Sequence, residues 1–439
     1  MLASDSPNNF ARVSKATYFP RVRVVDPDSA YHGELVDLLI EGGATVLSPQ
    51  DIPDGVERVE VEGLCVSPGW VDVGGAFHEP GHEEKETVAS FLAAAAVGGY
   101  TRVLAYPVTE PAVDDGGDVR AVSSLADEHV GVDLALIGAL SMGLRGEQLS
   151  TMGELSEAGV AFFGDGLRAV GDAKLLQLAL TYAQGFDGTV ISQPGERRLE
   201  GAGQMHEGRV STALGLPGLP AIAEEIGVAR DLALRSYRGG RLHFHALSLA
   251  STVAQAAEHA AAELTFGVSA LHLLATDEAL INYDVNVKVL PPLRGEEDRA
   301  ALQAALRSGA ASVLTSNHRP EDLESTRVEF PYAAFGAATI ELTYALATTA
   351  VGSDVAVDYL SRRNRAFAKL PAATLQAGAT AELTFFVPDA EFTVPPETLA
   401  SRAVNVPLVG TRLRGLPIGT YARGAWRPSA WADYLTPKP

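Results

Sequence analysis

The polar residues best placed for chemistry follow short apolar runs. The run VDVGGAFHEPG at 71–81 ends in a loop that carries histidine and glutamate. Imidazole and carboxylate groups that meet at such strand ends could hold a divalent metal and activate a bound water. A polar loop without a ligand is the other interpretation, because two histidines with no obvious third ligand are a weak metal signal. The residues of this possible site are His78, His82, Asp165 and His318.

The centre of the same run offers no ligand. Gly74, Gly75 and Ala76 have no side-chain donor atom, although they stand where a strand would deliver side chains to a site. A catalytic zinc needs about three protein ligands with N, O or S donors and an open position for water. This stretch therefore lies where a metal site is expected but lacks the side chains that would bind the metal.

Eight strand-like runs alternate with helical stretches, and this order predicts how the polar ends are positioned. Eight buried strands, each followed by a helix, are typical of a (β/α)8 barrel, whose active sites lie at the carboxyl ends of its strands. A doubly wound open sheet is the runner-up, but no glycine-rich fingerprint opens the first helix. The predicted strands are 66–73, 102–108, 133–140, 160–163, 188–192, 241–248, 263–269 and 312–316, with helices such as 85–99 and 251–262.

The two ends of the chain differ from its middle. Residues 15–66 and about 380–430 are rich in valine, threonine and turn residues and show little helical period. They predict one small β-sandwich domain that is assembled from both termini. The expected division is 1–66 for the N-terminal part of that domain, 67–375 for the α/β barrel, and 376–439 for the C-terminal part and tail.

Composition restricts the partners and the compartment. The 439 residues carry 55 acids against 34 bases, a net charge of −21, which argues against nucleic acid and anionic membranes as partners. The polar N-terminus does not resemble a secretory signal and no apolar run predicts a membrane helix, so we expect a cytoplasmic protein. Cys65 is the only cysteine, which excludes an internal disulfide and a cysteine-based zinc cage. The acidic, lysine-poor composition fits either a high-salt cytoplasm or a GC-rich genome.

Four stretches of the chain resemble the dihydroorotase family of the amidohydrolase superfamily. They occur in the family's order, and the resemblance covers nearly the whole chain. It implies a (β/α)8 barrel with a small β-sandwich built from both ends, in agreement with the pattern above, and a divalent metal, usually zinc. The stretches are PGWVDVGGAFHEPGHEEKET (68–87), MHEGRVSTALGLPGLPAIAEEIGVARD (205–231), LLATDEALINYDVNVKVLPPLRGEEDR (273–299) and AVNVPLVG (403–410).

The positions at which the family binds metal and substrate are altered in this chain. The resemblance places residues without donors, or with weak ones, at the family's metal-binding histidines, and asparagine at the catalytic aspartate. Such side chains do not hold zinc, and asparagine does not accept a proton as aspartate does. We therefore expect no catalytic residue and no metal cofactor. The metal positions are Gly74, Ala76, Asp165, Gln193, Ala246 and Asn317, of which Asp165 alone keeps an acid, and the altered substrate positions are His78, Val108 and Leu290.

Three histidines in or next to predicted strands remain to be interpreted. His243 and His245 lie two apart and so share one face of their strand. Because the resemblance puts the metal-ligand position at Ala246, on the opposite face, we expect both histidines to face the helices. His318 either contacts a small ligand or holds its loop by a hydrogen bond.

Three functions remain open. The first is a non-catalytic, dihydroorotase-like protein of pyrimidine biosynthesis that forms homo- or hetero-oligomers, with aspartate carbamoyltransferase as the partner that the resemblance implies. The second is an active cyclic-amide hydrolase, of dihydroorotase or hydantoinase type, with a rebuilt metal site. The third is a small-molecule binding module with an apolar pocket. That pocket would be lined by Ala76, Phe77, Val108, Ala246 and Leu290.

Overall fold

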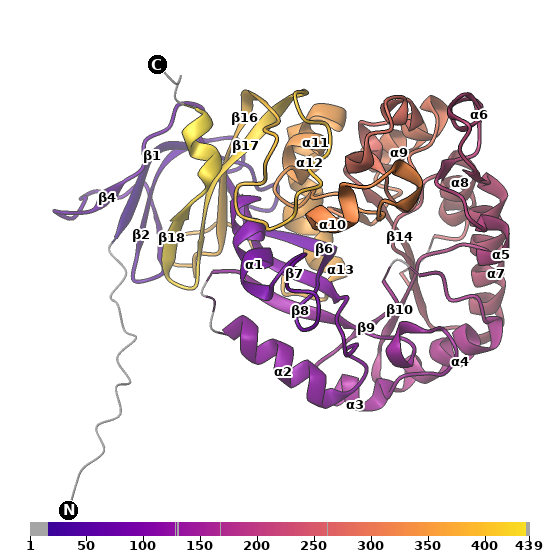
Figure 1. The fold of residues 1–439 in the computed structure, drawn as a ribbon. Coiled ribbons are helices and arrows are strands. Elements are labelled where there is room, and N and C mark those ends of the chain that lie inside the picture. The colour runs from indigo at the N-terminus through magenta and orange to yellow at the C-terminus, as the bar shows by residue number, and fades with distance from the viewer. Residues whose placement is uncertain (1–15, 128, 130, 167, 261, 436–439) are drawn as a thin grey trace, which may run out of the picture.

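The computed structural model describes residues 16–127, 129, 131–166, 168–260 and 262–435, and an eight-stranded parallel barrel occupies its middle (Figure 1). Neighbouring strands pair in the order of the chain, so each strand lies beside the one that precedes it. The predicted (β/α)8 architecture is confirmed. The barrel strands are β6 (Trp70–Phe77), β7 (Tyr100–Pro107), β8 (Asp133–Gly138), β9 (Phe162–Phe163), β10 (Thr189–Ser192), β13 (Arg241–Phe244), β14 (Leu264–Ser269) and β15 (Val313–Thr315).

Side-chain and backbone hydrogen bonds bring the last strand against the first. The amide of Ala76 donates to the carbonyl of His318 at 2.9 Å. The Asn364 amide group donates to the carbonyls of Val71 and Leu314 at 2.8 Å each, and so ties β6 to β15. The inward-facing positions of the barrel strands are buried, and large apolar side chains occupy them. They include Val73, Leu104, Ile137, Phe162, Ile191 and Val313.

Helices surround the barrel and cover its strands (Figure 1). Their ends follow ordinary capping chemistry: the Thr87 hydroxyl accepts from the amide of Ser90 at the start of α1. The helices are α1 (Val88–Val97), α2 (Gly116–Asp127), α3 (Met152–Glu157), α4 (Ala173–Ala183), α5 (Arg197–Glu200), α6 (Arg209–Leu214), α7 (Ala221–Arg238), α8 (Ala250–Glu258), α9 (Glu296–Ser308), α10 (Leu323–Thr326), α11 (Thr343–Val351), α12 (Ser353–Val357) and α13 (Asn364–Phe367).

The two chain ends meet in one β-rich domain, as the sequence predicts. Its sheet runs β18-β17-β16-β5-β1-β2-β3, with β4 paired to β1, so C-terminal strands continue directly into N-terminal ones. The rings of Phe19 and Phe385 stack at 4.0 Å between the two halves. The strands are β1 (Thr17–Val24), β2 (Leu35–Glu41), β3 (Ala44–Leu47), β4 (Glu57–Arg58), β5 (Cys65–Pro68), β16 (Leu383–Thr393), β17 (Arg412–Ala422) and β18 (Ala425–Pro428); a short pair, β11 (Met205–His206) and β12 (Gly218–Leu219), lies apart from both sheets.

The first predicted strand, 66–73, is in fact two strands of different sheets. β5 ends at Pro68 in the β-rich domain, and β6 starts at Trp70 in the barrel. Gly69 joins them where the chain passes so close to Thr101 that a Cβ would meet its hydroxyl at 2.3 Å. Apolar continuity across this joint hides the boundary in the sequence.

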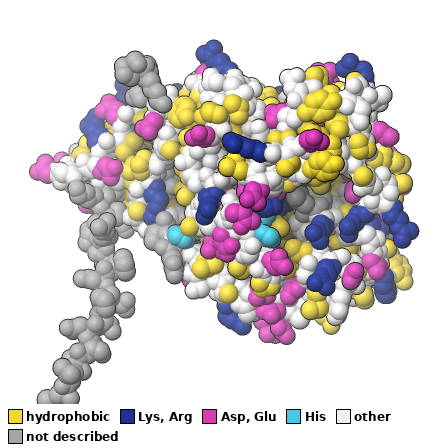
Figure 2. All heavy atoms as spheres, viewed as in Figure 1, with side chains coloured by type: hydrophobic (Ala, Val, Ile, Leu, Met, Phe, Trp, Pro, Cys, Tyr) yellow, Lys and Arg dark blue, Asp and Glu magenta, His cyan; other side chains and the backbone are white. Residues whose placement is uncertain are grey.

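The surface mixes charges. In Figure 2 acidic and basic side chains are interspersed with apolar ones over the visible face. None of the helices in the described part of the chain combines the length and the apolar character needed to cross a membrane.

Candidate functional site at the barrel mouth

A cavity of about 850 Å³ opens at the carboxyl ends of the barrel strands. Its walls come from the segments that follow β6, β7, β8, β9 and β15, where a barrel places its active site. Most of the lining side chains are charged or can become so, and they include acids and bases. These are His78, His82, Lys85, Glu110, Asp114, Arg145, Asp165, Arg168, Arg319 and Glu321.

His78 is a neutral, buried imidazole at the wall of this cavity. Its Nδ1 lies 3.0 Å from the carbonyl oxygen of Val108, so Nδ1 carries the proton and Nε2 keeps its lone pair. Burial, followed by the charge of Lys85, lowers the pKa of His78 to about 3. The side chain can therefore accept a proton or a hydrogen bond at Nε2 at neutral pH.

His82 and Asp165 line the same cavity but are engaged in local contacts. His82 is partly exposed, with Nδ1 3.3 Å from Glu84 and Nε2 3.6 Å from Glu110. Asp165 accepts the backbone amides of Leu140 and Ser141, both at 2.9 Å, and also the Ser141 hydroxyl. Burial raises the pKa of Asp165. This carboxylate organises the loop after β8, which accounts for its position without a metal.

His318 does not join these three side chains. It is buried behind β6, where its Nδ1 accepts the amide of Thr339 at 3.1 Å and its Nε2 lies 3.5 Å from Glu86. Its ring packs against Phe91 of α1. Of the two roles expected for His318, the structure shows the hydrogen bond that holds a loop.

His245 occupies the space that the glycine of the first strand leaves free. A Cβ on Gly74 would lie 1.9 Å from Cε1 of His245. The ring of His245 also meets Tyr106 edge-on at 5.5 Å, and its Nε2 lies 3.3 Å from Oδ1 of Asn317. Burial, with a smaller effect of Arg319, lowers the pKa of His245 to about 3. His245 therefore enters the barrel mouth rather than facing the helices.

His243 also faces the barrel interior, one layer deeper. Its ring packs on Phe367 at 4.3 Å, and its Nδ1 lies 2.8 Å from the Thr265 hydroxyl. The expectation that both histidines face the helices is therefore wrong. Residues 243 and 245 do share a face, but regular pairing of β13 ends at Phe244, so the side of Ala246 could not be extrapolated from strand alternation.

Asn317 is placed for a structural task. Its backbone has a positive φ of 47°, a conformation that asparagine tolerates better than most residues. Its amide nitrogen donates to the carbonyl of Leu290 at 3.1 Å, which leaves Oδ1 to accept from His245. Asn317 thus ties the loop after β15 to the segment around residue 290.

The mouth is polar rather than apolar. Val108 lines it, but Leu290 lines a separate cavity of about 50 Å³ together with Gln193. Ala76 and Ala246 are fully buried. The loops after the strands bring charged residues over the small side chains, so small residues at strand ends do not produce an apolar pocket here.

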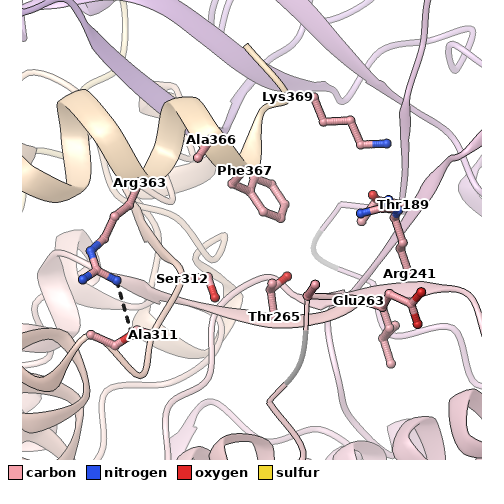
Figure 3. A pocket seen from close by; sticks show the side chains of 13 residues that line it. Thr189, Arg241, Glu263, Thr265, Ala311, Ser312, Arg363, Ala366, Phe367 and Lys369 are labelled. Carbon is pink, nitrogen blue, oxygen red and sulfur yellow. Dashed lines mark hydrogen bonds between the residues drawn. The ribbon is translucent and has the colours of Figure 1, made fainter. Parts of the chain in front are cut away.

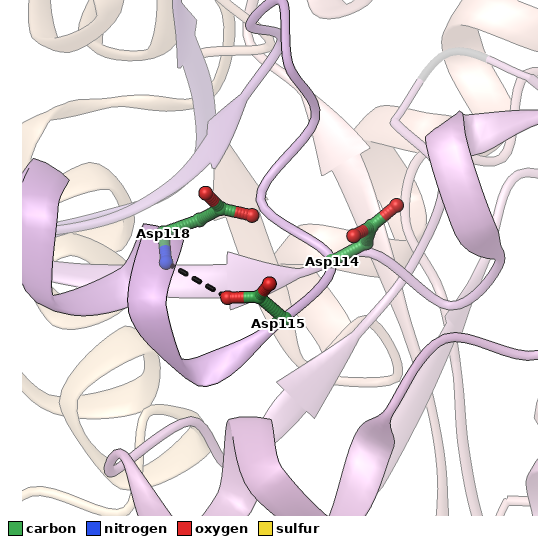
Figure 4. A group of neighbouring side chains, drawn as sticks. All are labelled: Asp114, Asp115 and Asp118. Carbon is green, nitrogen blue, oxygen red and sulfur yellow. Dashed lines mark hydrogen bonds between the residues drawn. The ribbon is translucent and has the colours of Figure 1, made fainter.

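The mouth residues do not fit a zinc ion of the family type. Glycine and alanine at 74, 76 and 246 offer no donor, and His78, His82, Asp165 and His318 do not bring three ligand atoms within reach of one ion. Within the described ranges, one group of three potential ligands exists, and it lies at the start of α2. It consists of Asp114, Asp115 and Asp118 (Figure 4).

This acidic group is explained by capping. Asp115 accepts the backbone amides of Gly117 at 2.6 Å and Asp118 at 3.0 Å, as Figure 4 shows for the second. Asp114 accepts the amide of Gly143 at 2.7 Å. Each of these bonds satisfies a backbone donor at a helix start or loop.

The sequence reasoning missed Arg319. This residue lies two positions after Asn317, and only 4% of its surface is exposed. Its guanidinium carbon lies 5.1 Å from the centroid of the Tyr106 ring. Burial lowers the pKa of Arg319 to about 10, so the side chain is still a cation at neutral pH. The available signal was an arginine in the loop directly after the last barrel strand.

A second cavity, of about 320 Å³, lies at the opposite end of the barrel (Figure 3). Thr189 and Arg241 begin their strands there, and Phe367 points into the cavity. Arg241 and Lys369 both pair with Asp187 at 2.9 Å. The amino-terminal face of a barrel serves stability, so we do not place chemistry here.

His243 predicts a measurable acid sensitivity. Burial holds the pKa of His243 well below 6.5. Below pH 6.5, His243 therefore binds a proton in the unfolded chain but stays neutral in the folded chain. This contribution to stability is present above pH 6.5 and is lost as the pH falls. We expect His243→Leu to reduce the slope of unfolding free energy against pH below pH 6.5, by an amount that approaches about 1.4 kcal/mol per pH unit near pH 5.

Urea denaturation at a series of pH values measures this slope. His259→Gln, at an exposed position, is the control and should leave the slope unchanged. Buried carboxyl groups such as Asp231, whose pKa burial raises, are common to all variants and cancel in the comparison. An unchanged slope in His243→Leu would contradict the prediction.

A family model described as Dihydro-orotase-like matches residues 63–252. The dihydroorotase of Syntrophus aciditrophicus is 34% identical over 412 residues, which cover 92% of this chain and 96% of that protein. The dihydroorotase of Streptomyces coelicolor is 36% identical over 405 residues, or 89% and 95%. The L-hydantoinase (dihydropyrimidinase) of Arthrobacter aurescens superposes with a TM-score of 0.81 at 19% identity, over 93% of this chain and 95% of that one, which shows the fold.

These relatives contradict the expected non-catalytic role. Curated proteins that match this chain over about nine-tenths of its length, at 32–36% identity, are dihydroorotases. That expectation rested on the altered positions alone. The altered positions concern only the metal ligands. The similarity over the whole length of the chain points to an enzyme.

Proposed function

This chain belongs to the dihydroorotase family of the amidohydrolase superfamily, and from that premise we propose that it opens or closes a cyclic amide of the dihydroorotase or hydantoinase type. The observation that carries the proposal is the end-to-end similarity to curated dihydroorotases. The charged cavity at the barrel mouth supports it, because it lies where such barrels perform their chemistry.

Ring opening adds water to the amide carbonyl and releases the ring nitrogen with a proton. The reaction needs positive charge near the carbonyl oxygen and a group that takes a proton from water. His78 offers a lone pair at Nε2 in this cavity, although a pKa of about 3 makes it a weak base in the ligand-free protein. An anion bound nearby would raise that pKa towards the useful range.

Zinc in this family would polarise the carbonyl and activate the water. The residues at 74, 76, 193, 246 and 317 do not fit that ion, so we assign no catalytic step to it. The rebuilt metal site expected from His78, His82, Asp165 and His318 is likewise not part of the proposal, because His318 lies behind β6. An association with aspartate carbamoyltransferase stays a prediction from the resemblance.

A hydrolysis assay tests the proposal. We expect saturable turnover of dihydroorotate or of a hydantoin by the purified protein, with metal content measured on the same sample. His78→Gln should lower kcat/KM by about 10²- to 10⁴-fold, the usual contribution of a positioned acid–base group. His82→Gln, which changes a partly exposed side chain of the same cavity, should change kcat/KM little. Flat progress curves with dihydroorotate and several hydantoins, with and without added zinc or manganese, would refute the proposed activity.

A further inference from the structure

Lys288 is a buried ammonium group with no acidic partner among the described residues. It follows the short helical turn Val285–Val287, and only 1% of its surface is exposed. Its Nζ donates to the carbonyl oxygens of Phe330 at 2.7 Å and Ala333 at 2.6 Å. The same nitrogen lies 4.9 Å from the ring centroid of Phe330 and 4.7 Å from that of Phe335. Burial lowers the pKa of Lys288 to about 8, so the side chain is mostly a cation at pH 7.

Two other lysines of the chain pair with carboxylates. Lys85 lies 2.8 Å from Glu321, and Lys369 lies 2.9 Å from Asp187. At Lys288 the carbonyls and rings of one segment, 330–335, take the place of the acid. Hydrogen bonds from an ammonium group are about twice as strong as neutral ones, and the aromatic faces attract the same charge. The ammonium group therefore fastens segment 330–335 to the turn at Lys288.

The fastened segment continues to the loop after β15, at the barrel mouth. The amide of Gly336 donates to the carbonyl of Lys288, and the amide of Arg319 donates to the carbonyl of Ala337, both at 2.9 Å. A Cβ on Gly336 would lie 2.5 Å from the carbonyl oxygen of Arg319, so the two segments are in close contact. Arg319 lines the mouth cavity. A shift of segment 330–337 would therefore move part of the cavity wall.

We propose that Lys288 is a positioning residue, whose ammonium group holds segment 330–337, and through it the loop 317–319, in the place that shapes the mouth cavity. Lys288 also lies two residues before Leu290, whose carbonyl accepts the amide group of Asn317 at 3.1 Å. Both chain segments that the ammonium group joins therefore contact the loop after β15. The effect of Lys288 on turnover rests on the proposed function, whereas its effect on the position of the loop does not.

Hydrogen exchange followed by mass spectrometry tests the clamp without a substrate. Lys288→Met keeps the length and apolar character of the stem but removes the ammonium group. We expect the amides of 317–321 and 329–337 to exchange at least about tenfold faster in this variant, because two charge-assisted hydrogen bonds are lost. The amides of 241–244, in β13, should be unchanged.

Lys369→Met is the matched control. Lys369 also donates to a backbone carbonyl, that of Asp187, and its Nζ lies 5.9 Å from the ring centroid of Phe162. These contacts are at the opposite end of the barrel, beside the second cavity. Lys369→Met should therefore leave the exchange of 317–321 and 329–337 as in the wild-type protein.

Turnover of the cyclic amide supplies a second readout. Lys288→Met should lower kcat/KM by about tenfold to 10²-fold, the usual consequence of a small misplacement at a site. Lys288→Arg keeps a cation with N–H donors that can lie between two rings, so it should recover part of both the exchange protection and kcat/KM. Lys369→Met should keep the wild-type kcat/KM.

The outcomes separate the role of Lys288 from the proposed function. If the wild-type protein turns over no cyclic amide, the proposed activity fails, and the exchange of 317–321 alone decides the role of Lys288. Unchanged exchange of 317–321 in Lys288→Met, or equally faster exchange over the whole chain, would overturn that role. Equal losses in Lys288→Met and Lys288→Arg would overturn it too, as would a wild-type kcat/KM in Lys288→Met. Should Lys288→Met not fold, Phe335→Leu removes one ring and keeps both hydrogen bonds, and it must show the same local pattern to a smaller degree.

Discussion

Replacing Gly74 with alanine is expected to lower the free energy of unfolding by about 3 kcal/mol or more. Two costs add. The backbone φ of 89° at this position is strained for any residue with a Cβ. The new methyl group would also lie 1.9 Å from the buried ring of His245, which has to move. Chemical denaturation followed by circular dichroism measures the loss.

Two further variants separate the backbone strain at Gly74 from the clash with His245. Gly146 has a φ of 71° and nothing within 4 Å of its hypothetical Cβ, so Gly146→Ala carries backbone strain without a clash. It should cost clearly less than Gly74→Ala. Adding His245→Ala to Gly74→Ala should recover part of the loss, as a favourable coupling in a double-mutant cycle. Equal costs at positions 74 and 146 would show that the ring of His245 yields freely.

The crowding around Gly74 also limits what a restored metal ligand could do there. The resemblance puts a histidine ligand of the family at position 74, yet the structure fills that space with a histidine from another strand. Gly74→His would meet the same ring and the same backbone strain as Gly74→Ala, with a larger side chain. Restoring the family's residue at this single position should therefore fail to restore a metal site.

Breaking the buried pair of Glu224 and Arg294 should cost about 3–5 kcal/mol of unfolding free energy, because the partner is left as an unpaired buried charge. Glu224 also accepts the Ser248 amide at 2.9 Å and the Thr252 hydroxyl at 2.7 Å. Arg294 in turn donates to the carbonyl of Leu219 at 3.3 Å. The pair thus joins α7, the segment after β13 and two loops of the family pattern. Glu224→Leu, measured by urea denaturation, is the test.

The double variant Glu224→Leu with Arg294→Met is the critical comparison. Removing both charges leaves no uncompensated ion, so the double variant should be more stable than Glu224→Leu alone. The exposed pair of Arg209 and Glu278 provides the surface control, and its loss should have little effect. If Glu224→Leu cost no more than removal of Glu278, the buried network would not contribute as argued.

Much of the fold could be predicted from the sequence. Eight apolar runs between helical stretches indicate the barrel, because a buried parallel strand must be apolar on both faces. The β-rich ends indicate a domain assembled from both termini, and the structure pairs Leu383 of β16 with Pro68 of β5. The joint at Gly69 could not be predicted. An uninterrupted apolar run does not show that its first half belongs to one sheet and its second half to another.

Part of the site could also be predicted. The sequence predicts His78, His82 and Asp165 as polar residues at strand ends, and the structure brings them to one cavity. His318 stands next to Asn317 in the chain but points behind β6 to Glu86. Neighbours in sequence at the end of a strand can face opposite sides, because the regular alternation stops where pairing stops.

The order of apolar runs and the family motifs are enough to predict a barrel of the dihydroorotase family in which residues 74, 76 and 246 supply no metal ligand. What occupies the space near these residues depends on contacts that form only in the folded chain. The ring of His245 lies against Gly74, and the guanidinium of Arg319 lies over Tyr106 without a hydrogen-bond partner among the described residues. These contacts join segments far apart in the chain, and they depend on strand register and on the loops that leave each strand. Spacing along one segment does not encode them.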